Sequence, residues 1–216
     1  MFLTSENETE SDGAARALKR ISQTEMMYPE QEFTSWSLQT NFGRYSFASG
    51  YVKAKNILDL GCGSGYGSSF LSKSGRADHV IGGYVSENAI KTASRMFQNN
   101  KLSFVWLDAT ALPFRNDSFD IVVSLEVIEH LVEYRIYLQE VKRVLRSYGT
   151  FICSTPNKGF VSWDPRRPGS VYHKKEFNIS EFKEILSEYI PKLTMFGQDY
   201  WKSAERGFSR VIDMMS

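Results

Sequence analysis

A short apolar segment that turns into glycines constrains this chain more than any other feature. Residues 56–71 read NILDLGCGSGYGSSFL, in which an apolar run is followed by glycines and then by a sequence of helical character. Glycine adopts left-handed backbone conformations without steric cost, and its missing side chain lets a ligand approach the main chain. The segment therefore predicts a strand, a turn at Gly61, Gly63 and Gly65, and a helix whose free N–H groups face an anion.

Short apolar segments alternate with helical segments through the middle of the chain. Strands are expected at 55–60, 79–83, 102–107, 119–125 and 149–155, and helices at 67–75, 86–100 and 126–146. This alternation is typical of a parallel sheet with helices on both faces. With two further strands near the end of the chain, we predict an α/β, Rossmann-like, doubly wound fold with a mostly parallel seven-stranded sheet.

The length of 216 residues fits one domain with a sizeable core. Residues 1–13 are polar and acidic, so we expect them to be disordered. The rest divides into a helical cap (14–51), a ligand-binding core (52–156), an irregular loop rich in Gly, Pro and aromatic residues (157–177), and a final helix with strands (178–216). The final helix has a plausible N-cap at Asn178 or Ser180.

Composition excludes several classes of protein. The net charge of +1 argues against a chain that coats nucleic acid through its overall field, although local basic patches remain open. Cys62 and Cys153 are too few for a disulfide framework, which favours a reducing compartment. The sequence has no long apolar run, so a membrane span is not predicted. Its N-terminus is not basic and then apolar, so a signal peptide is not predicted either. A cytoplasmic protein is the expectation.

The residues around the glycines indicate what the turn binds. Tyr66 and Ser68 break the Gly-x-Gly-x-x-Gly spacing, so a dinucleotide fingerprint is absent. Asp59 lies two residues before the first glycine, where a carboxylate would repel a diphosphate and could hold an ammonium group. We expect a ligand with an amino acid moiety.

Several motifs together carry a family resemblance. ILDLGCGSGYG resembles the first motif of class I S-adenosylmethionine-dependent methyltransferases, and LDATALPF resembles their segment after the third strand. SFDIVVSLEVIEHL and EVKRVLRSYGTFICSTPN resemble the fourth strand through the fifth, so that about residues 40–190 match in order. The resemblance implies S-adenosylmethionine as donor and S-adenosylhomocysteine as product, with Asp108 at the adenine amino group. The implied contacts are Asp59, Gly61, Gly63, Gly65, Tyr84, Asp108, Ala109 and Leu125.

One position departs from the family pattern. The family normally ends its second strand with an acid that binds both ribose hydroxyls, and here that residue is Tyr84. A phenol cannot offer two acceptor oxygens. We expect weak cofactor binding unless Glu87 reaches the ribose or Tyr84 stacks on the ligand.

The expected helix 126–146 carries acids and a histidine at one end. Helical spacing places Val127, Leu131 and their successors on a core stripe, and Glu126, Glu129, His130 and Glu133 on another face. These groups are either favourable charges at a helix N-terminus with a packed His130, or ligands of a divalent ion. The second interpretation resembles the Glu-x-x-Glu-His element of metal-dependent O-methyltransferases. The resemblance adds His173 as a fourth ligand to Glu126, Glu129 and His130, and an oxygen-rich site favours Mg²⁺.

Without a metal, His130 or His173 is the candidate general base, and Glu126 completes the catalytic candidates. The loop 157–177 is the expected acceptor site, where Trp163, Arg166 and Arg167 could hold a ring with an anionic group, or could simply be solvated. We predict methyl transfer to a small hydroxyl-bearing or sugar-like molecule. The alternatives are an RNA 2′-hydroxyl, which the scattered basic residues do not favour, and a non-catalytic binding protein, which only Tyr84 favours.

Overall fold

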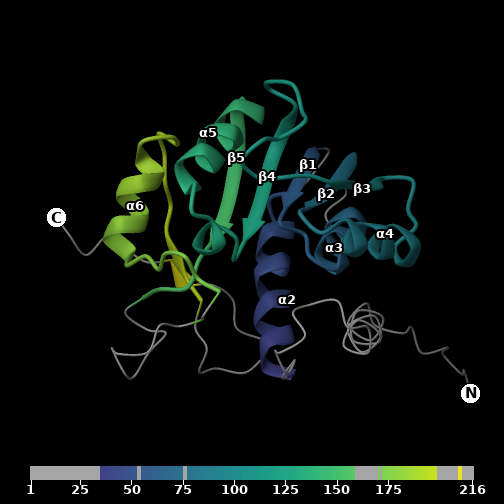
Figure 1. Ribbon diagram of the computed structural model, residues 1–216, viewed down its shortest axis with the longest axis horizontal. Helices are drawn as coiled ribbons and strands as arrows, with labels where there is room; N and C mark the ends of the chain where they lie inside the picture. Colours follow the sequence, from purple (N-terminus) through teal and green to yellow (C-terminus); the bar gives the residue numbers. More distant parts are fainter. Residues whose placement is uncertain are drawn as a thin grey trace, which may run out of the picture.

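The computed structural model describes residues 35–52, 55–74, 77–158, 170, 172–198 and 209–210. A five-stranded parallel sheet lies at its centre (Figure 1). Its strands are β1 (Asn56–Leu60), β2 (His79–Tyr84), β3 (Leu102–Trp106), β4 (Phe119–Leu125) and β5 (Leu145–Ser154), in the spatial order β3-β2-β1-β4-β5. The order changes direction between β1 and β4. The carboxyl ends of these two strands therefore flank the switch point at which open α/β sheets bind ligands.

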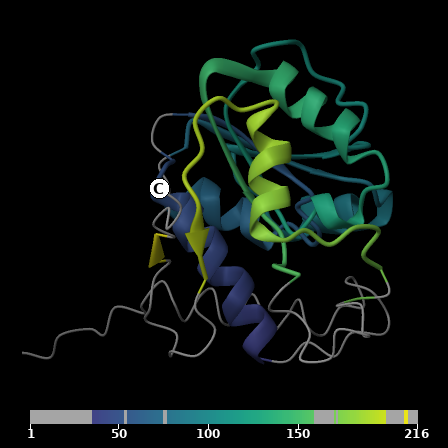
Figure 2. The same ribbon diagram turned by 90° about the vertical axis from the view of Figure 1, so that its left-hand side faces the viewer.

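Helices cover both faces of this sheet (Figures 1 and 2). One face packs against α2 (Ser35–Ser49) and α3 (Tyr66–Ser74), with α4 (Glu87–Met96) beside β2 and β3. The other face packs against α5 (Tyr134–Val144) and α6 (Ile179–Ser187). The doubly wound fold is confirmed.

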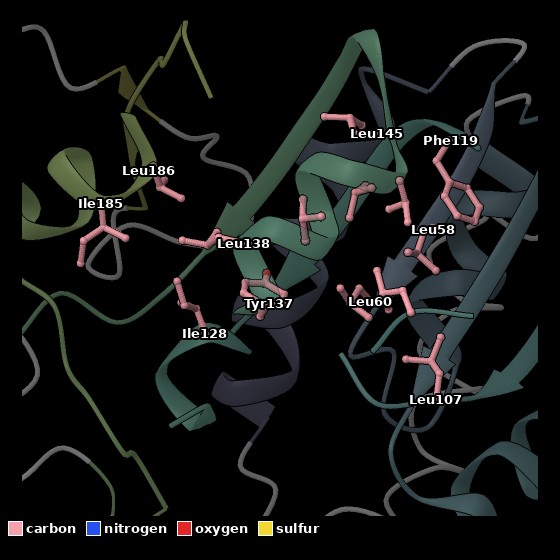
Figure 3. Close-up of a cluster of buried hydrophobic side chains, with 14 of the residues drawn as sticks. Leu58, Leu60, Leu107, Phe119, Ile128, Tyr137, Leu138, Leu145, Ile185 and Leu186 are labelled. Carbon is pink, nitrogen blue, oxygen red and sulfur yellow. The ribbon is translucent and has the colours of Figure 1, made fainter. Parts of the chain in front are cut away.

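Alternation along the strands divides the core into two layers. Leu58, Leu60 and Val122 pack toward α5 and α6, whereas Ile57 and Ile121 pack toward α2 and α3. Figure 3 shows the first layer, in which Tyr137 and Leu138 of α5 lie between the side chains of β1 and those of α6. Each apolar side chain buried in this way contributes about 1.5–3 kcal/mol. The pattern of apolar residues thus positions the carboxyl edge of the sheet.

The predicted helix 126–146 is wrong in its first two turns. β4 is followed by Glu126 in a left-handed conformation (φ 56°), then by a short 3₁₀ helix, η1 (Ile128–His130), and α5 begins only at Tyr134. The Glu126 N–H donates to the Ser154 carbonyl at 3.1 Å, so this residue continues the pairing with β5, and its left-handed φ excludes a right-handed helical turn here. The acids predicted to share a helix face therefore lie on a turn. β5 also begins four residues earlier than predicted, at Leu145.

The C-terminal part confirms one prediction and changes another. Asn178 caps α6 through a capping box with Glu181, at 2.9 and 3.0 Å. In the parts of the chain that the structure describes, β6 (Phe196–Gly197) and β7 (Ser209–Arg210) pair antiparallel with each other, separately from the five-stranded sheet. The expected seven strands therefore fall into two sheets.

Two further predictions concern the N-terminal residues and membrane spans. The expected disorder of residues 1–13 and the start of the helical cap at residue 14 lie outside the described residues. Among the residues described, no helix combines the length and the apolar character that a membrane span needs.

Candidate functional site

The glycine turn lies at the carboxyl end of β1, as predicted. Gly61, Gly63 and Gly65 have φ angles of 90°, 55° and 85°, which side-chain-bearing residues rarely adopt. A Cβ on Gly61 would lie 2.3 Å from Val127 Cγ2, whereas a Cβ on Gly63 would meet no atom within 4 Å. The backbone at Gly63 therefore faces open space, where a ligand can touch the main chain.

Asp59 lies beneath this turn, not at its mouth. Its carboxylate is 1% exposed and accepts hydrogen bonds from the Ser68 hydroxyl at 2.6 Å and the Tyr45 hydroxyl at 3.2 Å. Burial raises the pKa of Asp59 to about 6, against the effect of these two hydrogen bonds. Asp59 shares its strand face with Ile57, which directs it toward α2 and α3. In this structure the carboxylate joins β1 to these helices, which corrects the expectation that it faces an ammonium group at the mouth.

Helix α2 docks closely on the same region. The Tyr45 ring occupies the space of a side chain at position 67, since a Cβ on Gly67 would lie 1.9 Å from Tyr45 Cζ. Tyr45 and Tyr66 also meet edge to face, with ring centroids 5.5 Å apart. The cap predicted from the sequence is thus part of the wall that holds the glycine turn.

The neighbouring strand ends carry the other predicted cofactor contacts. Tyr84 ends β2 and pairs with Trp106, so this edge has a phenol where the family pattern has an acid. Asp108 is exposed just after β3. The N–H and hydroxyl of Thr110 donate to Asp108 Oδ1 at 2.8 and 2.7 Å, and these bonds lower the pKa of Asp108. The partly buried Ala109 and Leu125 complete this set at the same edge of the sheet.

A second group of candidate functional side chains lies on the other side of the switch point. Glu129 and His130 come from η1, and His173 comes from the segment that precedes α6. One ligand atom from each of these three residues lies within 4.8 Å of the other two. The His130 and His173 rings meet edge to face, with centroids 5.0 Å apart. The structure therefore brings together three of the four predicted metal ligands, here called the Glu129 cluster.

Glu129 has the features expected of a cation ligand. The side chain is 1% exposed, and its Oε2 accepts a hydrogen bond from Thr155 Oγ1 at 3.1 Å. Its Oε1 is buried and has no hydrogen-bond partner among the described residues. Burial, and then the nearby charge of Glu126, raise the pKa of Glu129 to about 8. A bound cation would supply the missing partner for this oxygen.

In both histidines the Nδ1 nitrogen lies beside a hydrogen-bond acceptor. His130 Nδ1 lies 3.3 Å from the Tyr172 carbonyl, and His173 Nδ1 lies 3.1 Å from Glu176 Oε1. A carbonyl cannot donate a hydrogen bond, and neither can a carboxylate, so each Nδ1 carries a hydrogen and the neutral form of each ring has its lone pair on Nε2. Burial lowers the pKa of His130, which favours this neutral form. Both rings are thus prepared as ligands or as proton acceptors.

This donor set fits a divalent transition metal better than the Mg²⁺ expected from the sequence. Two imidazole nitrogens and one carboxylate suit Mn²⁺, Zn²⁺ or Fe²⁺, whereas Mg²⁺ prefers oxygen ligands. The difference arises because Glu126 is not in the cluster. Its Oε2 pairs with Arg44 at 3.1 Å, and its Oε1 accepts the Ser154 hydroxyl at 2.6 Å.

Three supporting residues escaped the sequence analysis in these roles. Thr155 and Glu176 bond Glu129 and His173, and Arg44 pairs with Glu126. The spacing of Glu176, three residues after His173, is the one local signal that could have revealed a partner. The predicted acceptor contacts Trp163, Arg166 and Arg167 lie outside the described residues.

The comparisons with known proteins agree with this geometry. Residues 58–153 match the family model described as a methyltransferase domain. Those residues are thus similar to a methyltransferase domain, and the Rossmann-like sheet with a glycine turn at its switch point has the fold of solved S-adenosylmethionine-dependent methyltransferases.

Individual relatives refine this assignment. The chain is 32% identical over 134 residues to a protein named as a probable S-adenosylmethionine-dependent methyltransferase of Mycolicibacterium smegmatis, which covers 61% of this chain and 50% of the relative. It is 25% identical over 187 residues to the ubiquinone biosynthesis O-methyltransferase of Bartonella bacilliformis, covering 81% and 73%. A solved S-adenosylmethionine-dependent methyltransferase from Aquifex aeolicus has a TM-score of 0.60 at 16% identity, over 85% of this chain and 89% of that one. The chain spans about half the length of the mycobacterial relatives it matches.

Proposed function

We propose that this chain transfers the methyl group of S-adenosylmethionine to a hydroxyl group of a small molecule. The observation that carries the proposal is the position of the Glu129 cluster beside the glycine turn. Val127 packs directly on Gly61, and Glu129 and His130 follow on the same short turn. A donor seated at Gly63 and an acceptor at the cluster would therefore meet at one edge of the sheet.

On the donor side, the proposed work of the protein is binding and orientation. The sulfonium of S-adenosylmethionine is already activated, so that alignment of donor and acceptor supplies most of the rate. The open backbone at Gly63 and the N-terminus of α3 receive the amino acid part of the donor. Asp108, exposed and acidic at the end of β3, accepts a hydrogen bond from the adenine amino group.

On the acceptor side, Glu129 Oε1 and the Nε2 atoms of His130 and His173 would hold a divalent cation. Such a cation lowers the pKa of a hydroxyl group and positions it for attack. Glu176 and the Tyr172 carbonyl fix the two rings, while Thr155 fixes the carboxylate. Without a cation, the Nε2 lone pair of either ring can accept the proton of the hydroxyl.

The choice of a hydroxyl acceptor has support from similarity. The relative from Bartonella bacilliformis is named an O-methyltransferase of ubiquinone biosynthesis and covers 81% of this chain. A phenol or a sugar hydroxyl is the acceptor class that agrees with this name and with the cluster.

The test compares two histidine variants in methyl transfer from labelled S-adenosylmethionine to a panel of phenols, sugars and short RNAs. We expect transfer to a small hydroxyl compound that depends on Mn²⁺ and stops in EDTA. His173→Asn should lower Mn²⁺ affinity by about 10- to 100-fold or more, the range seen for supports of metal sites. His79→Asn serves as the control, because His79 bonds Ser103 at the start of β2, at the opposite end of that strand from the glycine turn.

The outcomes separate the alternatives. Equal turnover in EDTA and in His173→Asn would refute the metal site and leave His130 as the candidate base. Methylation of RNA alone would overturn the small-molecule acceptor. Calorimetric binding of S-adenosylhomocysteine without transfer to any acceptor would favour a binding protein.

A further inference from the structure

An ion pair joins helix α2 to the turn that carries the Glu129 cluster. Arg44 Nη2 lies 3.1 Å from Glu126 Oε2, and the two side chains are only 9% and 23% exposed. Arg44 Nη1 also donates to Asn41 Oδ1 at 2.6 Å, which orients the guanidinium from its own helix. The pair is therefore shielded from water and fixed in geometry, unlike a solvated surface pair.

Glu126 is held in a costly backbone conformation. Its φ of 56° is left-handed, and such a conformation at a residue other than glycine persists where surrounding bonds maintain it. Here those bonds are the N–H bond to the Ser154 carbonyl at 3.1 Å, the Ser154 hydroxyl on Oε1 at 2.6 Å, and the ion pair to Arg44. One backbone interaction and two side-chain interactions thus fix Glu126 at the start of the turn.

Glu126 lies close enough to the cluster to act on it electrostatically. Its charge raises the pKa of Glu129 and also acts on His130, whereas Arg44 acts on Glu129 in the opposite direction. Glu126 is nevertheless outside the group of ligand atoms that lie within 4.8 Å of one another. The Glu126 carboxylate, which lies next to the cluster, is instead paired with the Arg44 guanidinium.

We propose that Arg44 withholds Glu126 from the Glu129 cluster, so that helix α2 and a divalent cation at the cluster compete for one carboxylate. The inference rests on the proposed metal site. Filling the cluster draws Glu126 away from Arg44 and loosens α2 where it docks on the glycine turn. Because coupling between two binding events is reciprocal, a firmly docked α2 lowers the affinity for the cation.

The two partners of the ion pair are therefore expected to have opposite effects on Mn²⁺ affinity. Calorimetry on the full-length chain without methyl donor measures this affinity for the wild type, Arg44→Gln, Glu126→Gln and the double variant. Arg44→Gln should bind Mn²⁺ about tenfold more tightly, and Glu126→Gln about tenfold more weakly, within the usual range of coupling between sites. In the Glu126→Gln background, Arg44→Gln should have no effect beyond about twofold.

A matched control separates competition from simple charge removal. Lys174 is a cation whose charge also acts on His130, but it makes no ion pair with Glu126 in the described part of the chain. Lys174→Gln should change Mn²⁺ affinity by the same factor whether or not Glu126 is present. Hydrogen exchange gives the second readout: Mn²⁺ should speed exchange of the backbone amides of residues 41–49 in the wild type and not in Glu126→Gln.

Each contrary result would refute a different part of the proposal. If Arg44→Gln tightens Mn²⁺ binding equally in both backgrounds, or weakens it, the competition is refuted while the metal site stands. If α2 exchange is unchanged by saturating Mn²⁺, the link to α2 is refuted. A wild type that binds no Mn²⁺ refutes the metal site and this inference together, whereas binding of S-adenosylhomocysteine still tests the donor site separately.

Discussion

The glycine turn and the Glu129 cluster lie side by side at one edge of the sheet, but the chain builds them in different ways. The turn is continuous in sequence, and its shape follows from three glycines with positive φ. The cluster joins η1 to a segment more than forty residues later. A binding site formed by backbone atoms can be encoded by a short stretch of sequence, whereas a cluster of side chains depends on the packing of distant elements.

A buried aromatic residue anchors the segment that brings His173 to the Glu129 cluster. Phe177 is 1% exposed, contacts the rings of Tyr134 and Phe182, and forms a parallel bridge with Asn157. The amides of Lys174 and Lys175 add hydrogen bonds to the Glu129 carbonyl at 2.7 and 3.1 Å. His173 reaches the cluster because this segment is anchored at both places.

The largest expected effect comes from removing that anchor. Phe177→Ala should lower the free energy of unfolding by about 3–5 kcal/mol, because a buried ring leaves a cavity, and should weaken Mn²⁺ binding as well. Phe182→Ala is the control, since it removes the neighbouring buried ring from α6 but leaves Phe177 and its bridge to Asn157 in place. Urea unfolding and Mn²⁺ titration measure the two quantities. Equal loss of Mn²⁺ affinity in both variants would show that general stability, and not this anchor, positions the cluster.

The next effect tests where the two regions meet. Gly61→Ala should cost about 2–4 kcal/mol, because it combines a left-handed alanine with a clash against Val127, which leads into the cluster. Gly63→Ala should cost only about 1 kcal/mol, since its Cβ meets nothing, yet should weaken binding of S-adenosylhomocysteine. Thermal unfolding and calorimetry distinguish these profiles. Unchanged affinity in Gly63→Ala would mean that the ligand does not lie against that backbone.

The smallest expected effect concerns the ribose end of the donor seat. Tyr84→Asp should tighten S-adenosylhomocysteine binding by about 10- to 100-fold, because a carboxylate offers two acceptors to the two hydroxyls. Tyr84→Asn introduces a side chain of the same shape as aspartate but without the charge, and it should increase the affinity for S-adenosylhomocysteine only slightly. If Tyr84→Asp binds no better in calorimetry, the phenol is no handicap in this chain.

Sequence reasoning succeeded where structure is local. The strand, turn and helix at residues 56–74, the capping of α6 by Asn178, and the alternating core follow from glycine chemistry and apolar periodicity. Asp59 was placed on the wrong side of the turn because its direction depends on which strand face meets α2. A motif identifies the residue, and packing decides where its side chain points.

The cluster was harder to predict for a related reason. Periodicity extended α5 back to Glu126, since nothing local shows that the Glu126 N–H bonds to β5. His130 was named from helical spacing and His173 through resemblance, and the structure brings them together. The exclusion of Glu126 depends on Arg44, which lies more than eighty residues earlier and forms no pattern with it.

The docking of Tyr45 on the glycine turn sets a practical limit on shortening the protein. The segment 58–153 that matches the family model lacks Tyr45, which donates to the buried Asp59, and lacks the buried residues of α6. An excised fragment with those boundaries would uncover part of each sheet face and would leave Asp59 with the bond from Ser68 but without the bond from Tyr45. A truncated version suited to crystallisation or ligand screening should retain at least residues 35–198.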